Sequence, residues 1–199
     1  MAPIEFWFDL SSPYSYLASH WIGPLAQRHG RTVDWKPLLL GAAFKVTGLP
    51  VLVDTPLKGD YSRHDFARSA RFAGVPYRQP EPFPISTVHA ARGVLWLQRT
   101  DPARAEPFIH AAFGAYFVDN QDLSAPAVLA RLTREMGIDP AAFAAAVQQA
   151  EFKDALRRQV DTALARGIFG APFIVIDGEP FWGNDRQAQV ERWLSGGPF

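Results

Sequence analysis

The chain contains no cysteine among its 199 residues. This absence excludes disulfide bonds, cysteine-ligated zinc and dithiol redox chemistry carried by the protein itself. Net charge is also absent, because 20 lysines and arginines balance 20 aspartates and glutamates. A chain without excess positive charge has no electrostatic footprint for nucleic acid or for an anionic membrane surface, so neither is expected as a partner.

Long apolar runs are missing too. Runs such as residues 37–40 and 173–176 fall far short of the ~20 residues that span a bilayer, so no transmembrane segment is predicted. The start, Met1 to Glu5, lacks the basic and apolar pattern of a signal peptide, and the expected compartment is the cytoplasm. The five histidines show no metal-ligand spacing, so no metal site is predicted.

The first forty residues predict a β-α-β unit. Residues 4–9 are bulky and rich in strand-forming types, which indicates a largely buried strand. Ser12 and Pro13 then provide a helix N-cap and the fixed φ of a first helical turn, followed by a helix to residue 29 that Gly30 can close. A second strand is predicted over residues 32–37.

From about residue 59 to residue 166 the sequence predicts a series of amphipathic helices, several of which end at a glycine. The strand pattern then returns at residues 173–176, and Asp177-Gly178 is a hairpin turn signal before a short strand at residues 179–182. Asn184-Asp185 has the composition of an N-cap for a closing helix. The predicted order is therefore β-α-β, a helical block, and β-β-α.

Three local sequences resemble those of one enzyme family. They are Phe8 to Ala18 (FDLSSPYSYLA), Gly167 to Phe173 (GIFGAPF) and Phe181 to Arg186 (FWGNDR). In this order they closely resemble the 2-hydroxychromene-2-carboxylate isomerases and the related kappa-class glutathione transferases. The resemblance implies an α/β, thioredoxin-like β-α-β / β-β-α core with an inserted all-helical subdomain. The implied domains are 1–45 with 167–199 for the core and 59–166 for the insert, joined by a connection at 46–58.

In a thioredoxin-like protein the Ser12 to Ser15 stretch carries Cys-x-x-Cys, and here both positions are serine. The resemblance implies that bound glutathione supplies the thiol that the chain lacks, with Ser12 donating a hydrogen bond to its sulfur. A helix N-terminus also favours an anion through its unpaired N–H groups and partial positive charge. Lowering a thiol pKa from ~8.5 by ~2 units requires ~2.7 kcal/mol, which one charge-assisted hydrogen bond and a helix terminus together supply.

The resemblance assigns the other glutathione contacts as well. It places a cis bond at Ala171-Pro172, where the Ala171 backbone pairs with the peptide of glutathione as an added strand. It brings Asn184 and Asp185 to the γ-glutamyl end, and Lys58 to the glycyl carboxylate. Each residue also has a plainer interpretation: caps for Ser12, Asn184 and Asp185, a strand start for Pro172, and a solvated surface lysine for Lys58.

One position departs from the family pattern. The relatives carry an asparagine several residues before the lysine, whereas this chain reads Val46-Thr47-Gly48-Leu49-Pro50. One polar contact is therefore unassigned on the substrate side of the site. The aromatic residues Trp7 and Tyr14 could line the pocket of a flat substrate or belong to the core.

The leading hypothesis is a glutathione-dependent isomerase that interconverts 2-hydroxychromene-2-carboxylate and trans-o-hydroxybenzylidenepyruvate or a related aromatic catabolite. The nearest alternative is a kappa-class-like glutathione transferase, which forms a stable conjugate. An alternative of another class is a non-catalytic thioredoxin-like peptide-binding protein. A homodimer is expected from the resemblance alone.

Overall fold

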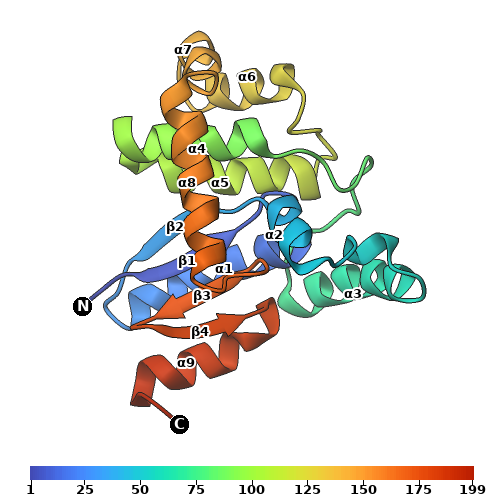
Figure 1. Cartoon of the computed structure of the whole chain (residues 1–199), viewed down its shortest axis with the longest axis vertical. Coiled ribbons are helices and arrows are strands. Elements are labelled where there is room, and N and C mark those ends of the chain that lie inside the picture. Colours follow the sequence, from blue (N-terminus) through green and yellow to red (C-terminus); the bar gives the residue numbers. More distant parts are fainter.

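The computed structural model describes all 199 residues and contains one four-stranded sheet surrounded by helices (Figure 1). The strands are β1 (Ile4–Phe8), β2 (Val33–Pro37), β3 (Phe173–Ile176) and β4 (Glu179–Trp182). Their order across the sheet is β2-β1-β3-β4. β1 pairs in parallel with β2 and antiparallel with β3, and β3 and β4 form an antiparallel hairpin. The predicted thioredoxin-like core is confirmed.

The helices follow the predicted order, with one addition. They are α1 (Pro13–Arg28), α2 (Leu40–Thr47), α3 (Lys58–Ala73), α4 (Val88–Thr100), α5 (Pro102–Phe117), α6 (Pro126–Glu135), α7 (Pro140–Ala146), α8 (Ala150–Ala165) and α9 (Gln187–Gly196). Two 3₁₀ turns, η1 (Leu52–Asp54) and η2 (Asn184–Arg186), precede α3 and α9. Helix α2 was not predicted from the sequence. None of the helices combines the length and apolar character that crossing a membrane requires.

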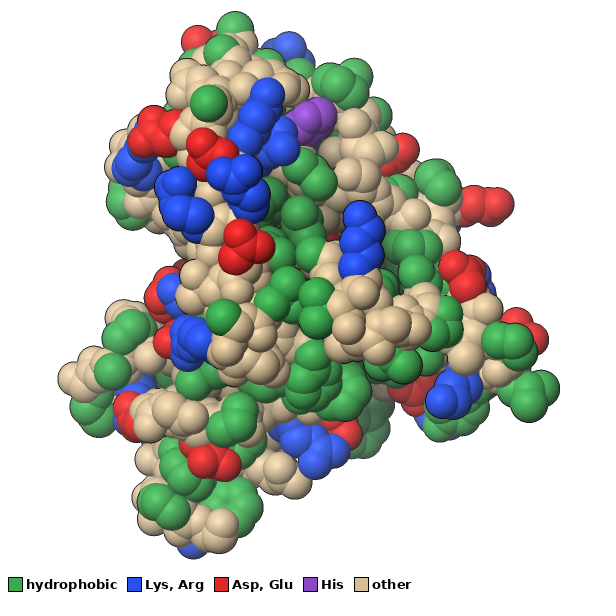
Figure 2. Space-filling view, viewed as in Figure 1, with side chains coloured by type: hydrophobic (Ala, Val, Ile, Leu, Met, Phe, Trp, Pro, Cys, Tyr) green, Lys and Arg blue, Asp and Glu red, His purple; other side chains and the backbone are tan.

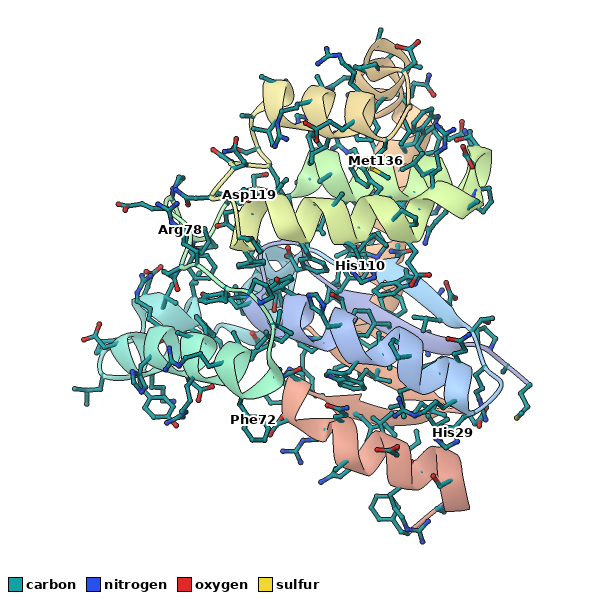
Figure 3. The ribbon with its side chains drawn as sticks, turned by 180° about the vertical axis from the view of Figure 1, so that it is seen from behind. His29, Phe72, Arg78, His110, Asp119 and Met136 are labelled. Carbon is teal, nitrogen blue, oxygen red and sulfur yellow. The ribbon has the colours of Figure 1, made fainter.

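Side chains of β1 point alternately to the two faces of the sheet, and different helices cover each face. Phe6 and Phe8 belong to a buried cluster with residues of α1 and α5, whereas Trp7, on the opposite face, belongs to a second cluster with residues of α8. Trp7 is only 2% exposed and belongs to the core, and it does not line the large cavity described below. Behind the sheet, α1 runs alongside it, and His110 of α5 lies on the side of α5 that faces α1 (Figure 3).

The helical insert and the core share the larger of these clusters, which contains 33 buried residues from both parts of the chain. Helix α8 ends the insert, and it nevertheless packs on one face of the sheet through Leu156, Val160 and Ala163. In Figure 1 it extends from the sheet to the far end of the helical block. The domain boundaries at residues 45, 59 and 166 stay a prediction, since the two parts are joined by continuous packing.

The turns that the sequence predicted have the expected backbone. Asp177 and Gly178 both have positive φ, 52° and 92°, as a two-residue hairpin of this type requires. Gly30, which follows α1, has φ 64°. Because β3 runs antiparallel to β1, the start of α1 and the start of β3 lie at the same end of the sheet.

Candidate functional site

A large cavity opens where the first residues of α1 meet the loop before β3. Its volume is about 1610 Å³, and residues of α2, α3 and η2 complete its wall. All six residues predicted for the site line this one cavity, namely Ser12, Lys58, Ala171, Pro172, Asn184 and Asp185. Figure 2 shows hydrophobic side chains gathered in the hollowed centre of this view, with lysine and arginine side chains beside them. The structure therefore brings together residues that lie up to 173 positions apart in the sequence.

Ser12 is the N-cap of α1, as predicted. Its hydroxyl oxygen accepts a hydrogen bond from the Ser15 N–H at 3.1 Å, and its backbone lies in the extended region that an N-cap adopts. The hydroxyl donates in turn to the Ala171 carbonyl oxygen at 3.1 Å. Ser12 is 4% exposed, so both contacts are shielded from bulk water.

The start of α1 retains one free amide. The Ser12 N–H donates to the Asp9 carbonyl at 2.9 Å, Pro13 has no N–H, and the Ser15 N–H is used by the cap. The Tyr14 N–H has no acceptor within the protein. This helix N-terminus therefore presents one N–H group and the positive end of a 16-residue helix dipole to an anion.

The Ala171-Pro172 peptide bond is cis, as predicted; Glu81-Pro82 and Phe83-Pro84 are cis as well. Pro172 accepts a hydrogen bond from the Gly183 N–H at 3.1 Å through its carbonyl oxygen, which links the start of β3 to the end of β4. Ala171 lies just before β3, and its N–H has no partner within the protein. An extended segment with a free N–H at a cavity wall is suited to pairing with another backbone.

The prediction that Asn184 and Asp185 cap the last helix is wrong. They form η2, and α9 begins only at Gln187, without a side-chain cap. The Asn184 amide oxygen accepts a hydrogen bond from Trp21 Nε1 at 2.9 Å, which ties η2 to α1. Asp185 forms an ion pair with Arg186, and this contact holds the pKa of the Asp185 carboxyl below its usual range.

Lys58 is the first residue of α3, and its side chain is exposed at the cavity. It has no carboxylate within ion-pair distance, so its charge is available to a ligand. Leu49, from the Val46 to Pro50 segment, also lines the cavity and is 62% exposed. This segment therefore contributes an apolar side chain to the cavity wall.

The sequence named Tyr14 as a possible pocket residue, and Tyr14 does line the cavity, but its pairing with a carboxylate was missed. The Tyr14 hydroxyl donates to Asp65 Oδ2 at 2.5 Å, and Arg68 pairs with the same carboxylate. Burial raises the pKa of Asp65, but the contacts with Tyr14 and Arg68 outweigh it and keep that pKa below the usual value. Burial and the neighbouring Asp65 raise the pKa of Tyr14, so its hydroxyl stays protonated. Both residues line the cavity, and no sequence pattern linked them because they are 51 positions apart.

A second carboxylate missed from the sequence holds the framework of the site. Asp9, at the end of β1, is 4% exposed and accepts hydrogen bonds from both the N–H and hydroxyl of Ser11, from the Leu40 N–H and from the Thr87 hydroxyl. These contacts join the loop before α1, the start of α2 and the residue before α4. Burial raises the pKa of Asp9 against the effect of these donors. Removing the carboxylate would leave several buried donors unpaired.

Comparisons with known proteins agree with this fold. The chain matches the family model of the DSBA-like thioredoxin domain over residues 3–195. It is 30% identical over 193 residues to the 2-hydroxychromene-2-carboxylate isomerase of Sphingobium xenophagum, covering 96% of this chain and 97% of the relative. It is 26% identical over 207 residues to glutathione S-transferase kappa 2 of Caenorhabditis elegans, covering 96% and 91%.

A solved structure of a 2-hydroxychromene-2-carboxylate isomerase superposes with a TM-score of 0.87 at 26% identity and covers 96% of this chain and 94% of that chain. The superposition therefore includes both the core and the helical insert. The chain belongs to the DSBA-like thioredoxin family and, within it, to the family of 2-hydroxychromene-2-carboxylate isomerases.

Proposed function

We propose that the protein is a glutathione-dependent isomerase that interconverts 2-hydroxychromene-2-carboxylate and trans-o-hydroxybenzylidenepyruvate or a related aromatic catabolite. One observation carries this proposal: in a protein without cysteine, the Ser12 hydroxyl, the free Tyr14 N–H and the free Ala171 N–H belong to residues that line the same cavity. Donors converging at a helix N-terminus favour a bound anion. Because the chain has no cysteine of its own, we propose that this anion is the thiolate of a bound glutathione.

The residues of the cavity fit the groups of glutathione. Ala171 supplies a backbone edge for the cysteinyl residue, and Lys58 supplies a positive charge for the glycyl carboxylate. Asp185, from η2, and Asp65, from α3, both line the cavity. Two nearby carboxylates suit the ammonium group of a γ-glutamyl end.

When bound, glutathione supplies a nucleophilic sulfur that adds to the conjugated carbon of the substrate and later leaves, which permits rotation about the former double bond. The protein's part is to hold that sulfur as an anion. Ser12 donates to it, the Tyr14 N–H adds a second donor, and the dipole of α1 favours its charge. The protonated Tyr14 hydroxyl stays engaged with Asp65 and fixes the first turn of α1 against α3.

The other side of the cavity suits a flat anionic substrate. Phe44, Phe66 and Phe83 line it, and Phe66 also packs edge-on against Tyr14 at 5.0 Å between ring centroids. Lys45, in the last turn of α2, also lines the cavity and has no carboxylate partner within ion-pair distance. We propose that Lys45 pairs with the substrate carboxylate while the aromatic side chains contact the ring.

The test is the absorbance of 2-hydroxychromene-2-carboxylate incubated with the protein, with and without glutathione. A glutathione-dependent approach to the equilibrium mixture is expected, with substrate and product of equal mass. If the isomerisation is equally slow with and without glutathione, the proposed function is wrong.

A kappa-class-like transferase is the second candidate, supported by the 26% identity to glutathione S-transferase kappa 2. It predicts a stable conjugate with an electrophile such as a chlorinated nitrobenzene, and the mass of the product distinguishes the two. A non-catalytic peptide-binding protein instead predicts no thiol chemistry and unchanged ligand affinity in Ser12→Ala. The homodimer and the cytoplasmic location stay predictions, the first of which sedimentation analysis checks.

A further inference from the structure

The Ser12 hydroxyl has a single proton, and the structure shows where it goes. Its oxygen accepts from the Ser15 N–H and its proton is donated to the Ala171 carbonyl, both at 3.1 Å. A sulfur anion beside Ser12 can receive this proton only if the hydroxyl turns away from Ala171. This reorientation needs only rotation about the Cβ–Oγ bond of Ser12, so the hydrogen bond from the Ser15 N–H to the Ser12 oxygen can persist.

The Ala171 carbonyl would then need another donor. Ser12 is its hydrogen-bond partner within the protein, because Ala171 precedes β3 and takes no part in the ladder with β1 or β4. Ala171 is half-buried at the cavity wall, where an unpaired carbonyl is unfavourable. The same residue has a free N–H. In an antiparallel hydrogen-bonded pair, two residues exchange both of their N–H···O bonds.

We propose that Ala171 couples backbone pairing to thiol activation, an inference that rests on the proposed glutathione dependence. A cysteinyl residue that pairs with Ala171 accepts from the Ala171 N–H and donates its own N–H to the Ala171 carbonyl. This second bond releases the Ser12 hydroxyl, which then donates to the sulfur of the same cysteinyl residue. The protein thereby ionises most fully those thiols in which the carbon next to the CH₂–S group carries an N–H donor.

Through this coupling, Ser12 and Ala171 select which bound thiols are strongly ionised. A thiol without that N–H would still meet the dipole of α1 and the free Tyr14 N–H, but the Ser12 proton would stay on Ala171. The expected pKa of a bound glutathione thiol is ~2 units below the ~8.5 of a free thiol. Without the Ser12 bond, we expect less than about half of this shift, or roughly tenfold less thiolate well below the bound pKa.

The experiment compares glutathione with its depsipeptide analogue, in which an ester oxygen replaces the cysteinyl N–H. Each ligand is bound to the full-length protein at a concentration that calorimetry shows to be saturating, and thiolate absorbance near 240 nm is titrated with pH. The pKa of each free thiol is the reference. We expect the full shift for glutathione and less than half of it for the analogue.

Ser12→Ala should give the two bound thiols the same small shift, and Ser12→Thr, which retains the hydroxyl, should keep the difference. If the analogue binds too weakly to saturate, the pH dependence of its Kd reports the same pKa, since affinity rises with pH only where the bound thiol ionises first. An equally ionised analogue in the unsubstituted protein would overturn the coupling. Failure of glutathione itself to bind would instead overturn the proposed function.

Discussion

Replacing Ser12 by alanine removes two interactions whose consequences can be separated. A thiol of pKa ~8.5 is about 3% ionised at pH 7, and a pKa of ~6.5 makes it about three quarters ionised. A hydrogen bond to a charged group contributes at least ~1.5 kcal/mol, or ~1.1 pKa units, and complete loss of the shift returns the pKa to ~8.5. With saturating glutathione, Ser12→Ala should therefore lower kcat/KM for the aromatic substrate at pH 7 by a factor of about 4 to 25. The acid limb of the pH profile should move toward the pKa of the free thiol.

The same substitution removes the N-cap of α1, which costs about 0.5 to 2 kcal/mol of stability. Asp139 provides a matched control, because its side chain caps α7 by accepting from the Ala141 N–H at 2.9 Å and does not line the cavity. Asp139→Ala should lose a similar amount of stability in thermal unfolding and keep its activity. The reasoning is refuted if Ser12→Ala keeps its activity within twofold with an unchanged pH profile, or if Asp139→Ala loses as much activity.

Three further predictions concern other parts of the molecule. Ser15 is fully buried and its hydroxyl has no partner, so Ser15→Ala should leave the free energy of unfolding unchanged or raise it by about 1 kcal/mol in chemical denaturation; a clear loss would contradict this. Lys45→Met should raise KM for the aromatic carboxylate about tenfold without changing KM for glutathione. Lys153→Met, at an exposed position of α8, should change neither KM, and equal kinetics in both variants would exclude the role of Lys45. Packing lowers the pKa of His110 and of the neighbouring His20, so the unfolded chain binds more protons below pH ~6.5 and stability should fall from pH 7.5 to 5.5. His110→Asn should weaken this pH dependence in thermal unfolding, and an unchanged slope would contradict the assignment.

Local chemistry was enough to predict most of the fold. Ser12 and Pro13 start α1 and Asp177-Gly178 forms the hairpin turn, because each of these signals acts within a few residues. The family motifs then located six residues that line one cavity. Their individual roles in binding stay predictions.

Helix α2 shows why the remainder was missed. It has only eight residues, and Leu39 at its N-cap supplies no side-chain hydrogen bond. The Leu40 N–H is satisfied by Asp9 Oδ2 at 2.7 Å, from the end of β1. A capping carboxylate that comes from 31 residues earlier leaves no local signal, so the segment could not be distinguished from a connection.

The contacts around the cavity are equally non-local. Tyr14 meets Asp65 and Trp21 meets Asn184 only after α1, α3 and η2 have packed together. The Asn184 side chain looked like a helix cap because its residue type is common there, but the indole N–H of Trp21 occupies its oxygen. A residue's type indicates what it can bind, and the packed fold decides which partner it meets.

The central claim is that the protein binds the sulfur of glutathione as a thiolate at the start of α1. The most direct test is NMR of glutathione labelled with ¹³C at the cysteinyl β-carbon, whose chemical shift follows ionisation of the attached sulfur. Titration of the saturated complex should give a pKa of ~6.5 rather than ~8.5, and Ser12→Ala should return it most of the way to the higher value. A bound thiol that titrates like the free one, with or without Ser12, would contradict the account.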